Sequence, residues 1–425
     1  MTAALKFTRG PIVLSEGFRF FFLAAAIFSA FSMIVWLGWL AIHAAQGMLM
    51  HVPFAAPPHE WHAHEMIFGF GACVVAGFLL TAVPSWTGEP PSGMTFVSAM
   101  AALWIAGRLA VFFSSYLPAT LVMVFDVAFI PALSLKILLN LLKRPKPQNM
   151  LFLGLLAMLL LGNLLVHLDW MGVLEDTATR GLLVGLLTLS ALISVLGGRV
   201  TPAFTRNALL RLGQESDLPE TRPWLEVLGI GSAILLVLLI PFDPYERMLA
   251  VIAGIAAVSN GLRLSGWRTL KMLDQPILWS LHLGFAMLVA GYAALALHWA
   301  GLGIGQAAAV HVLGVGAVGG MTLAVMSRAI LGHTGRPLVA PTPIAYAYAA
   351  VAVAAVVRSF GVAVMPDRYY TVMFVAGGLW IAAYGLFIWV YAPMVTSPRL
   401  DADANVSPGT GPEPLKRPLV QRQNQ

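Results

Sequence analysis

The feature that most constrains this 425-residue chain is a succession of about twelve apolar runs, each close to the length of a membrane span. The hydrocarbon core of a bilayer is roughly 30 Å thick, and about 20 helical residues cross it. Because lipid offers no partners for backbone N–H and C=O groups, such runs must be helical. The sequence therefore predicts an all-α, polytopic integral membrane bundle of about 12 transmembrane helices.

The predicted spans follow one another through short connections. They are residues 18–42, 64–86, 94–113, 117–141, 150–167, 181–200, 224–241, 245–264, 277–298, 305–330, 344–364 and 370–391. Residues 1–17 are predicted to be a cytoplasmic N-terminal segment, and residues 18–395 a single transmembrane domain. Residues 396–425 are rich in Pro, Gly and polar residues, which predicts a disordered cytoplasmic tail.

Charge placement predicts the orientation. Only 10% of the residues are charged, against about 25% in soluble domains. The net charge of +6 is spread between apolar runs instead of forming one basic stripe, so no nucleic-acid partner is expected. Most Lys and Arg fall in alternate connections, as the positive-inside rule requires. We therefore expect a multi-pass membrane protein with both termini cytoplasmic.

Histidines mark the candidate chemistry, because ionisable groups within membrane helices usually serve cofactors, ion paths or paired functional groups. Neutral imidazole binds both haem iron and copper well. His62 and His64 are two residues apart, so on a helix their side chains point about 200° from each other and could serve two centres. The alternative is that they are interfacial histidines bonded to water or lipid headgroups. Glu60 or Glu65 could accept the second ring N–H of a ligating histidine.

The remaining candidates differ in depth. His167, His298 and His311 are predicted to lie toward the same outer side as His62 and His64, and so do His43, His51 and His59. His282 and His333 fall near the cytoplasmic side, where helix packing or loop capping is the favoured interpretation.

Buried charges form a second group, comprising Arg108, Asp126 and Arg358. Arg108 is expected to pair with Asp126, and the alternative is that an arginine holds a haem propionate. The spacing of Gly316 and Gly320 favours close helix packing over room for a flat macrocycle.

Several sequence blocks resemble one family. Residues 61–88, WHAHEMIFGFGACVVAGFLLTAVPSWTG, are similar to the opening motif of the NnrS family, which are haem- and copper-containing membrane proteins associated with the nitric oxide response. Further blocks follow in family order at residues 163–168, 198–205, 279–284, 311–326 and 332–337. The resemblance extends over roughly residues 10–395.

The resemblance implies b-type haem and copper as cofactors, with nitric oxide or an iron–nitrosyl species as the ligand. The histidines inside its motif blocks are the implied cofactor-binding and metal residues: His62, His64, His167, His282, His311 and His333. Arg108 is a further candidate for cofactor binding, through a haem propionate. Replacing His64 or His311 is expected to alter a haem spectrum, whereas replacing His43 is not.

No catalytic residue or electron donor follows from the motifs. Phosphate-binding loops, nucleophile elbows and zinc-protease motifs are absent from the sequence, so hydrolase and nucleotidase functions are excluded. Two other classes stay open: a transporter or channel lined by histidines and the Arg108–Asp126 pair, and an accessory protein for metalloenzyme assembly.

Overall fold

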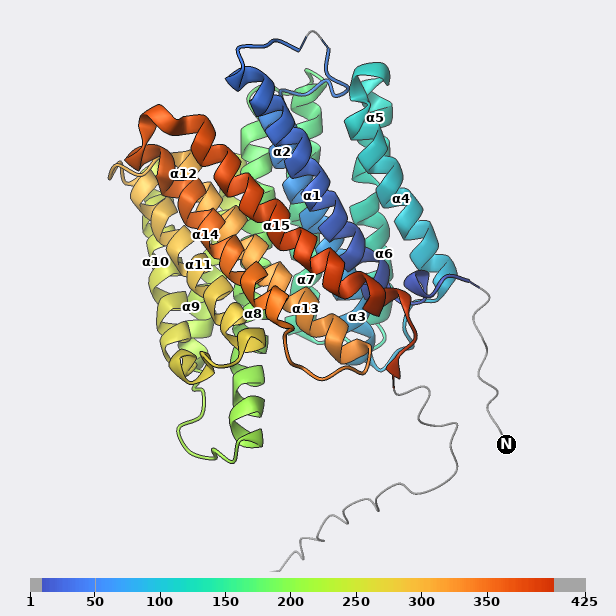
Figure 1. Ribbon diagram of the computed structural model, residues 1–425, viewed down its shortest axis with the longest axis vertical. Coiled ribbons are helices and arrows are strands. Elements are labelled where there is room, and N and C mark those ends of the chain that lie inside the picture. The colour runs from blue at the N-terminus through green and yellow to red at the C-terminus, as the bar shows by residue number, and fades with distance from the viewer. Residues whose placement is uncertain (1–9, 50, 401–425) are drawn as a thin grey trace, which may run out of the picture.

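A computed structural model describes residues 10–49 and 51–400, and this part of the chain is helical, without strands. Twelve helices in it are long and apolar enough to cross a membrane, which confirms the predicted architecture (Figure 1). The prediction of a disordered tail falls mostly on residues 401–425, and part of the predicted N-terminal segment on residues 1–9. Both lie outside the described residues.

The helices are as follows. They are α1 (Gly17–Ala44), α2 (Pro58–His64), η2 (Glu65–Gly71), α3 (Ala72–Thr87), α4 (Met94–Phe112), α5 (Ala119–Val127), α6 (Phe129–Leu141), α7 (Pro147–Trp170), α8 (Ala178–Arg211), α9 (Pro223–Leu239), α10 (Glu246–Ser265), α11 (Pro276–Trp299), α12 (Gln306–His311), η6 (Val312–Gly319), α13 (Gly320–His333), α14 (Thr342–Val364) and α15 (Tyr369–Thr396). Short 3-10 turns occupy Ile12–Leu14, Ser114–Tyr116, Ile240–Phe242, Thr269–Met272 and Pro366–Arg368.

Two predicted boundaries were wrong in ways that affect the site. The second span begins at Pro58, six residues before the predicted start, because proline at the first helical position lacks only an N–H that would be unpaired anyway. His62 is consequently helical. The sixth span, α8, has 34 residues and continues to Arg211, beyond the predicted end at residue 200 (Figure 1, green).

Two spans change their winding in mid-course. The second consists of α2, the π-helix η2 and α3, and the tenth consists of α12, the π-helix η6 and α13. A π-helix displaces the regular backbone hydrogen bonds, and its carbonyls need other donors. Trp104 Nε1 donates to the carbonyl of Gly69 in η2 at 3.1 Å, and the Tyr384 hydroxyl donates to that of Gly319 in η6 at 3.1 Å. Side chains of neighbouring helices thus stabilise both π segments.

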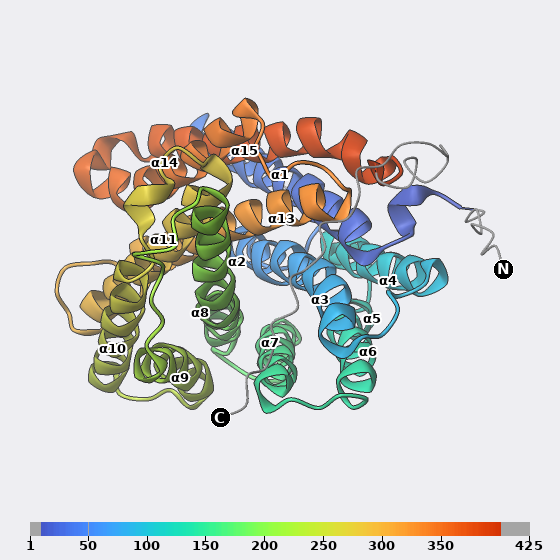
Figure 2. The ribbon, with the colours of Figure 1, turned by 90° about the horizontal axis from the view of Figure 1, so that it is seen from below.

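The helices form one bundle in which α8 lies between two lateral groups. Seen from below, α9, α10 and α11 are on one side of α8 and α4 to α7 on the other (Figure 2). Helices α1 and α15 pack along each other. Where α1 begins and α15 ends, Arg19 Nη1 donates to the carbonyls of Val395 and Ser397 at 3.1 and 2.9 Å. Both ends of the described chain therefore lie at the same end of the bundle.

We call this end of the bundle the basic face. It is the end at which α8 stops at Arg211 and α13 stops at His333, and at which α1 begins (Figure 1). The opposite end, where α2 and α12 begin, is called the outer face.

Gly316 and Gly320, both in the tenth span, lie where this span packs closely against α11, as predicted. A Cβ on Gly316 would lie 3.1 Å from Met287, and one on Gly284 would lie 2.9 Å from the backbone nitrogen of Met321, next to Gly320. Small residues thus allow the two backbones to approach.

Candidate haem and copper sites

The turn of α2 presents its two histidines to two different environments near the outer face. His62 lines a cavity between α1, η2, α8, α12 and α14, whereas His64 points into a buried polar cluster formed with α4, α5 and α7. This divergence follows from the helical geometry, since residues two apart lie about 200° apart around the axis.

The buried cluster gathers two histidines and two carboxylates around one arginine. His64, Asp126 and His167 are each at most 2% exposed, and their candidate ligand atoms lie within 4.8 Å of one another. Asp126 Oδ2 is 2.8 Å from His167 Nε2 and 3.2 Å from His64 Nε2. Arg108 forms ion pairs with both Glu65 and Asp126, so the predicted Arg108–Asp126 pair is confirmed.

The hydrogen-bond donors and acceptors around the His64 ring do not match in number. Its Nδ1 donates to Glu65 Oε1 at 2.9 Å, which in a neutral imidazole leaves Nε2 as an acceptor. Yet Nε2 faces two acceptors, Asn163 Oδ1 at 2.9 Å and Asp126 Oδ2 at 3.2 Å, while Asn163 Nδ2 donates to Asp126. With Nδ1 as the donor, Nε2 has no donor partner among the described side chains, and a metal ion at Nε2 would satisfy it together with the two facing oxygens.

The charges of the cluster point the same way. Two carboxylates, Glu65 and Asp126, surround the single guanidinium of Arg108, which leaves one net negative charge in a site removed from water. Uncompensated charge in an apolar interior is strongly unfavourable. His64, Asp126 and His167 form an imidazole–carboxylate–imidazole set, and the Glu65 carboxylate lies behind His64. Metal-binding histidines in proteins are commonly oriented by a carboxylate in this way.

The cavity on the other side of α2, which we call the outer cavity, has a volume of about 410 Å³ and a mainly apolar lining. Its polar lining residues are His59, Glu60 and His62 from α2, Thr179 from α8, Gln306 and His311 from α12 and Arg358 from α14, of which His62, His311 and Arg358 bear on cofactor binding. A Cβ on Gly314, also in the lining, would lie 3.8 Å from Leu186 Cδ1, an ordinary van der Waals contact, so the η6 backbone is not crowded at this point.

Both imidazoles of the outer cavity have a ring nitrogen available. His311 Nδ1 donates to the carbonyl of Ala307 at 2.7 Å, which fixes the tautomer and leaves Nε2 as an acceptor. The His62 ring stacks on Trp36 at 4.9 Å between centroids, and its buried Nδ1 has no hydrogen-bond partner. Arg358 makes no ion pair with any carboxylate of the described residues. The cavity thus offers two imidazoles that each have one ring nitrogen without a partner, and one guanidinium, that of Arg358, without an ion pair among the described residues.

The NnrS family profile, described as NnrS protein, matches residues 12–399. The chain belongs to the NnrS family. No curated protein matches it. As an NnrS family member with twelve candidate spans, it is a multi-pass membrane protein of a family associated with the nitric oxide response.

The other predicted site residues of this NnrS protein lie elsewhere. His282 is 1% exposed, and both of its ring nitrogens are engaged, with Thr205 at 2.8 Å and Thr269 at 2.9 Å. His333 is exposed on the basic face and packs against Phe18 with ring centroids 5.3 Å apart. Arg108 belongs to the buried cluster and does not line the outer cavity.

Two residues of the NnrS site gained their importance only from the structure. Arg358 was noted as a buried charge, but only the fold places α14 beside His62 and His311. Asn163 had one available signal: it precedes His167 by four residues, which puts both side chains on one face of α7.

Proposed function

We propose that this protein binds b-type haem in the outer cavity and a copper ion in the buried cluster, and acts in the nitric oxide response of the bacterial inner membrane. The observation that carries the proposal is the convergence of two free imidazoles and an unpaired guanidinium on one apolar cavity. Family membership supports the same cofactors.

The lining of the outer cavity suits haem in three respects. His62 and His311 would hold the haem through their imidazole nitrogens, and the Trp36 ring and the Ala307 carbonyl keep these imidazoles in orientation. The planar guanidinium of Arg358 would bind a haem propionate, which is the role considered above for Arg108. Apolar side chains from α1, α8 and η6 form most of the cavity wall, against which the macrocycle would pack. Bound haem iron would supply a binding site for nitric oxide.

The buried cluster suits copper because imidazole nitrogen and carboxylate oxygen are donors that this metal accepts. His64 Nε2, His167 Nε2 and Asp126 Oδ2 are the ligand atoms that we propose. Glu65 keeps Nε2 of His64 free by accepting the proton of Nδ1, and Arg108 holds Asp126 and Glu65 in place. The positive ion would remove the excess negative charge of the cluster.

Spectroscopy and metal analysis of matched variants test this proposal. Purified wild-type protein should show a Soret band with bound iron and copper. His62→Ala and His311→Ala should lose or shift the Soret band and keep copper, whereas His64→Ala should lose copper. This proposal thus assigns haem to His62 and His311, whereas the expectation from the sequence was a change of the haem spectrum on replacing His64 or His311.

His43→Ala is the control, because His43 is exposed, its ring lies against Trp39, and it does not line the outer cavity. A colourless, iron-free wild-type protein from haem-replete cells would exclude the haem assignment. Identical spectra for the His62, His311 and His43 variants would exclude the proposed ligands.

The transporter alternative has no comparable support. Arg108 and Asp126 satisfy each other inside the cluster, and neither lines the outer cavity.

A further inference from the structure

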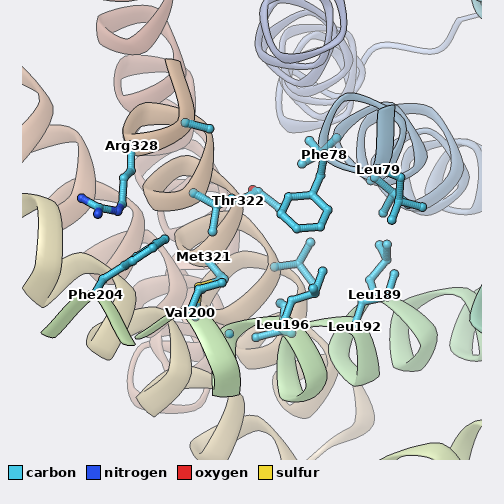
Figure 3. Close-up of a pocket in the computed structure, with 18 of the residues that line it drawn as sticks. Phe78, Leu79, Leu189, Leu192, Leu196, Val200, Phe204, Met321, Thr322 and Arg328 are labelled. Atoms are coloured by element: carbon cyan, nitrogen blue, oxygen red, sulfur yellow. The ribbon is translucent and has the colours of Figure 1, made fainter. Parts of the chain in front are cut away.

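A second large cavity opens toward the basic face, between α3, α8 and α13 (Figure 3). This inner cavity has a volume of about 330 Å³. Its walls are almost entirely apolar, with Phe78 and Leu79 from α3, Leu192 and Leu196 from α8, and Met321 from α13. His333, which the family resemblance implied as a ligand, lines it, but none of the ligands proposed above for haem or copper does.

One end of the inner cavity carries a positive charge. Figure 3 shows Arg328 beside Phe204, away from the leucine side chains at the other end. The Arg328 guanidinium lies 3.8 Å from the centroid of the Phe204 ring, which fixes its orientation. It forms no ion pair with an acidic side chain among the described residues, and no Asp or Glu lines the cavity. Arg211, near the end of α8, adds a second positive charge to the surroundings of Arg328.

The length of the inner cavity indicates how long the apolar part of a bound molecule would be. Between Val318 and Arg328 its lining covers about 15 Å of the tenth span, roughly half of a bilayer's hydrocarbon core, and beyond Arg328 it continues to His333 at the basic face. That is the depth of one leaflet, which the acyl chain of a lipid spans. Several lining residues, among them Phe78 and Val325, are only half-buried, so the walls do not seal the cavity from its surroundings.

We propose that the inner cavity binds one anionic phospholipid, with its phosphate on Arg328 and one acyl chain between α3, α8 and α13. The charge complementarity is direct, because a guanidinium without a carboxylate partner binds phosphate through charge-assisted hydrogen bonds. Basic pockets between transmembrane helices at the cytoplasmic side are suited to anionic headgroups. The proposal does not depend on haem or copper binding, since it uses different residues.

Lipid retention tests the site. The protein is purified from membranes in detergent and incubated with either phosphatidylglycerol or phosphatidylcholine, and bound lipid is counted by native mass spectrometry. Wild-type protein should retain one phosphatidylglycerol in preference to phosphatidylcholine. Arg328→Gln should bind phosphatidylglycerol about tenfold more weakly, as expected for the loss of one charge-assisted contact. Arg206→Gln, an exposed arginine on α8 outside the lining, should bind it like wild type.

A second variant tests the chain-binding part without changing charge. Leu196→Phe fills the cavity between α3 and α8 and should also reduce phosphatidylglycerol retention, while the Soret band and metal content stay as in wild type. Equal retention in wild type and Arg328→Gln would overturn the proposal. So would equal binding of the two lipids, or a fatty acid or quinone recovered in place of the phospholipid.

Discussion

At the scale of single residues, the spacing of His62 and His64 predicted two environments but could not identify them. Which groups surround an imidazole depends on helices distant in sequence: Asp126 comes from α5 and His311 from α12. Glu65 is the exception, because it is adjacent to His64 in sequence, and the sequence alone already indicates it as a possible hydrogen-bond partner. The structure confirms its hydrogen bond to His64.

Asp126 offers the sharpest test at this scale. Asp126→Asn leaves Arg108 with one carboxylate partner and removes the carboxylate that is proposed to bind copper together with His64 and His167. Breaking a buried ion pair costs about 3–5 kcal/mol, so a clear fall in thermal stability in detergent is expected. Copper content, measured by mass spectrometry of the metal, should fall with it.

Asp243→Asn is the matched control for that substitution. Asp243 is exposed and has a φ of 50°, a conformation that Asn adopts as readily as Asp. It should keep both copper and stability. Full copper occupancy in Asp126→Asn would contradict the proposed ligand set.

At the scale of elements, the π segments η2 and η6 were beyond sequence reasoning. Their stability depends on donors from other helices, Trp104 and Tyr384, and on glycines that admit close neighbours. No local pattern encodes such contacts. The apolar length of each span, by contrast, is a local property, and all twelve spans were predicted from it.

The packing of η2 against α8 can be tested at Gly185. A Cβ at this position would lie 2.6 Å from both Ile67 Cγ2 and Phe68 Cζ, so Gly185→Ala forces η2 away from α8. Overpacking of this kind typically costs about 1–3 kcal/mol, and we expect a lower melting temperature in detergent.

Gly154→Ala on α7 serves as the comparison, because a Cβ there meets no atom within 4 Å. It should melt like wild type. A Gly185→Ala protein as stable as Gly154→Ala would show that η2 accommodates the extra methyl group.

At the scale of the whole molecule, the bundle and the common end of its two described termini agree with the even number of predicted spans. The placement of α8 between the two lateral groups did not follow from the sequence. Helix neighbours are selected by packing between side chains that are similarly apolar on most faces, so the hydropathy of the runs carries little information about it.

The orientation in the membrane is a prediction that reporter fusions can check. Basic loops are retained on the cytoplasmic side, so green fluorescent protein fused to the C-terminus should be fluorescent. Alkaline phosphatase inserted in the connection between α7 and α8, residues 171–177, should be active. The reverse pattern would mean that the basic face is extracytoplasmic.

The winding of η2 has a consequence for how the two centres depend on each other. Each residue gained or lost in a helix rotates what precedes it by about 100°. If this segment rewound as a regular α-helix, the turn Pro58–His64 would swivel, and His62 and His64 would leave their respective sites in the same movement. The proposed haem and copper sites would then be completed or lost together.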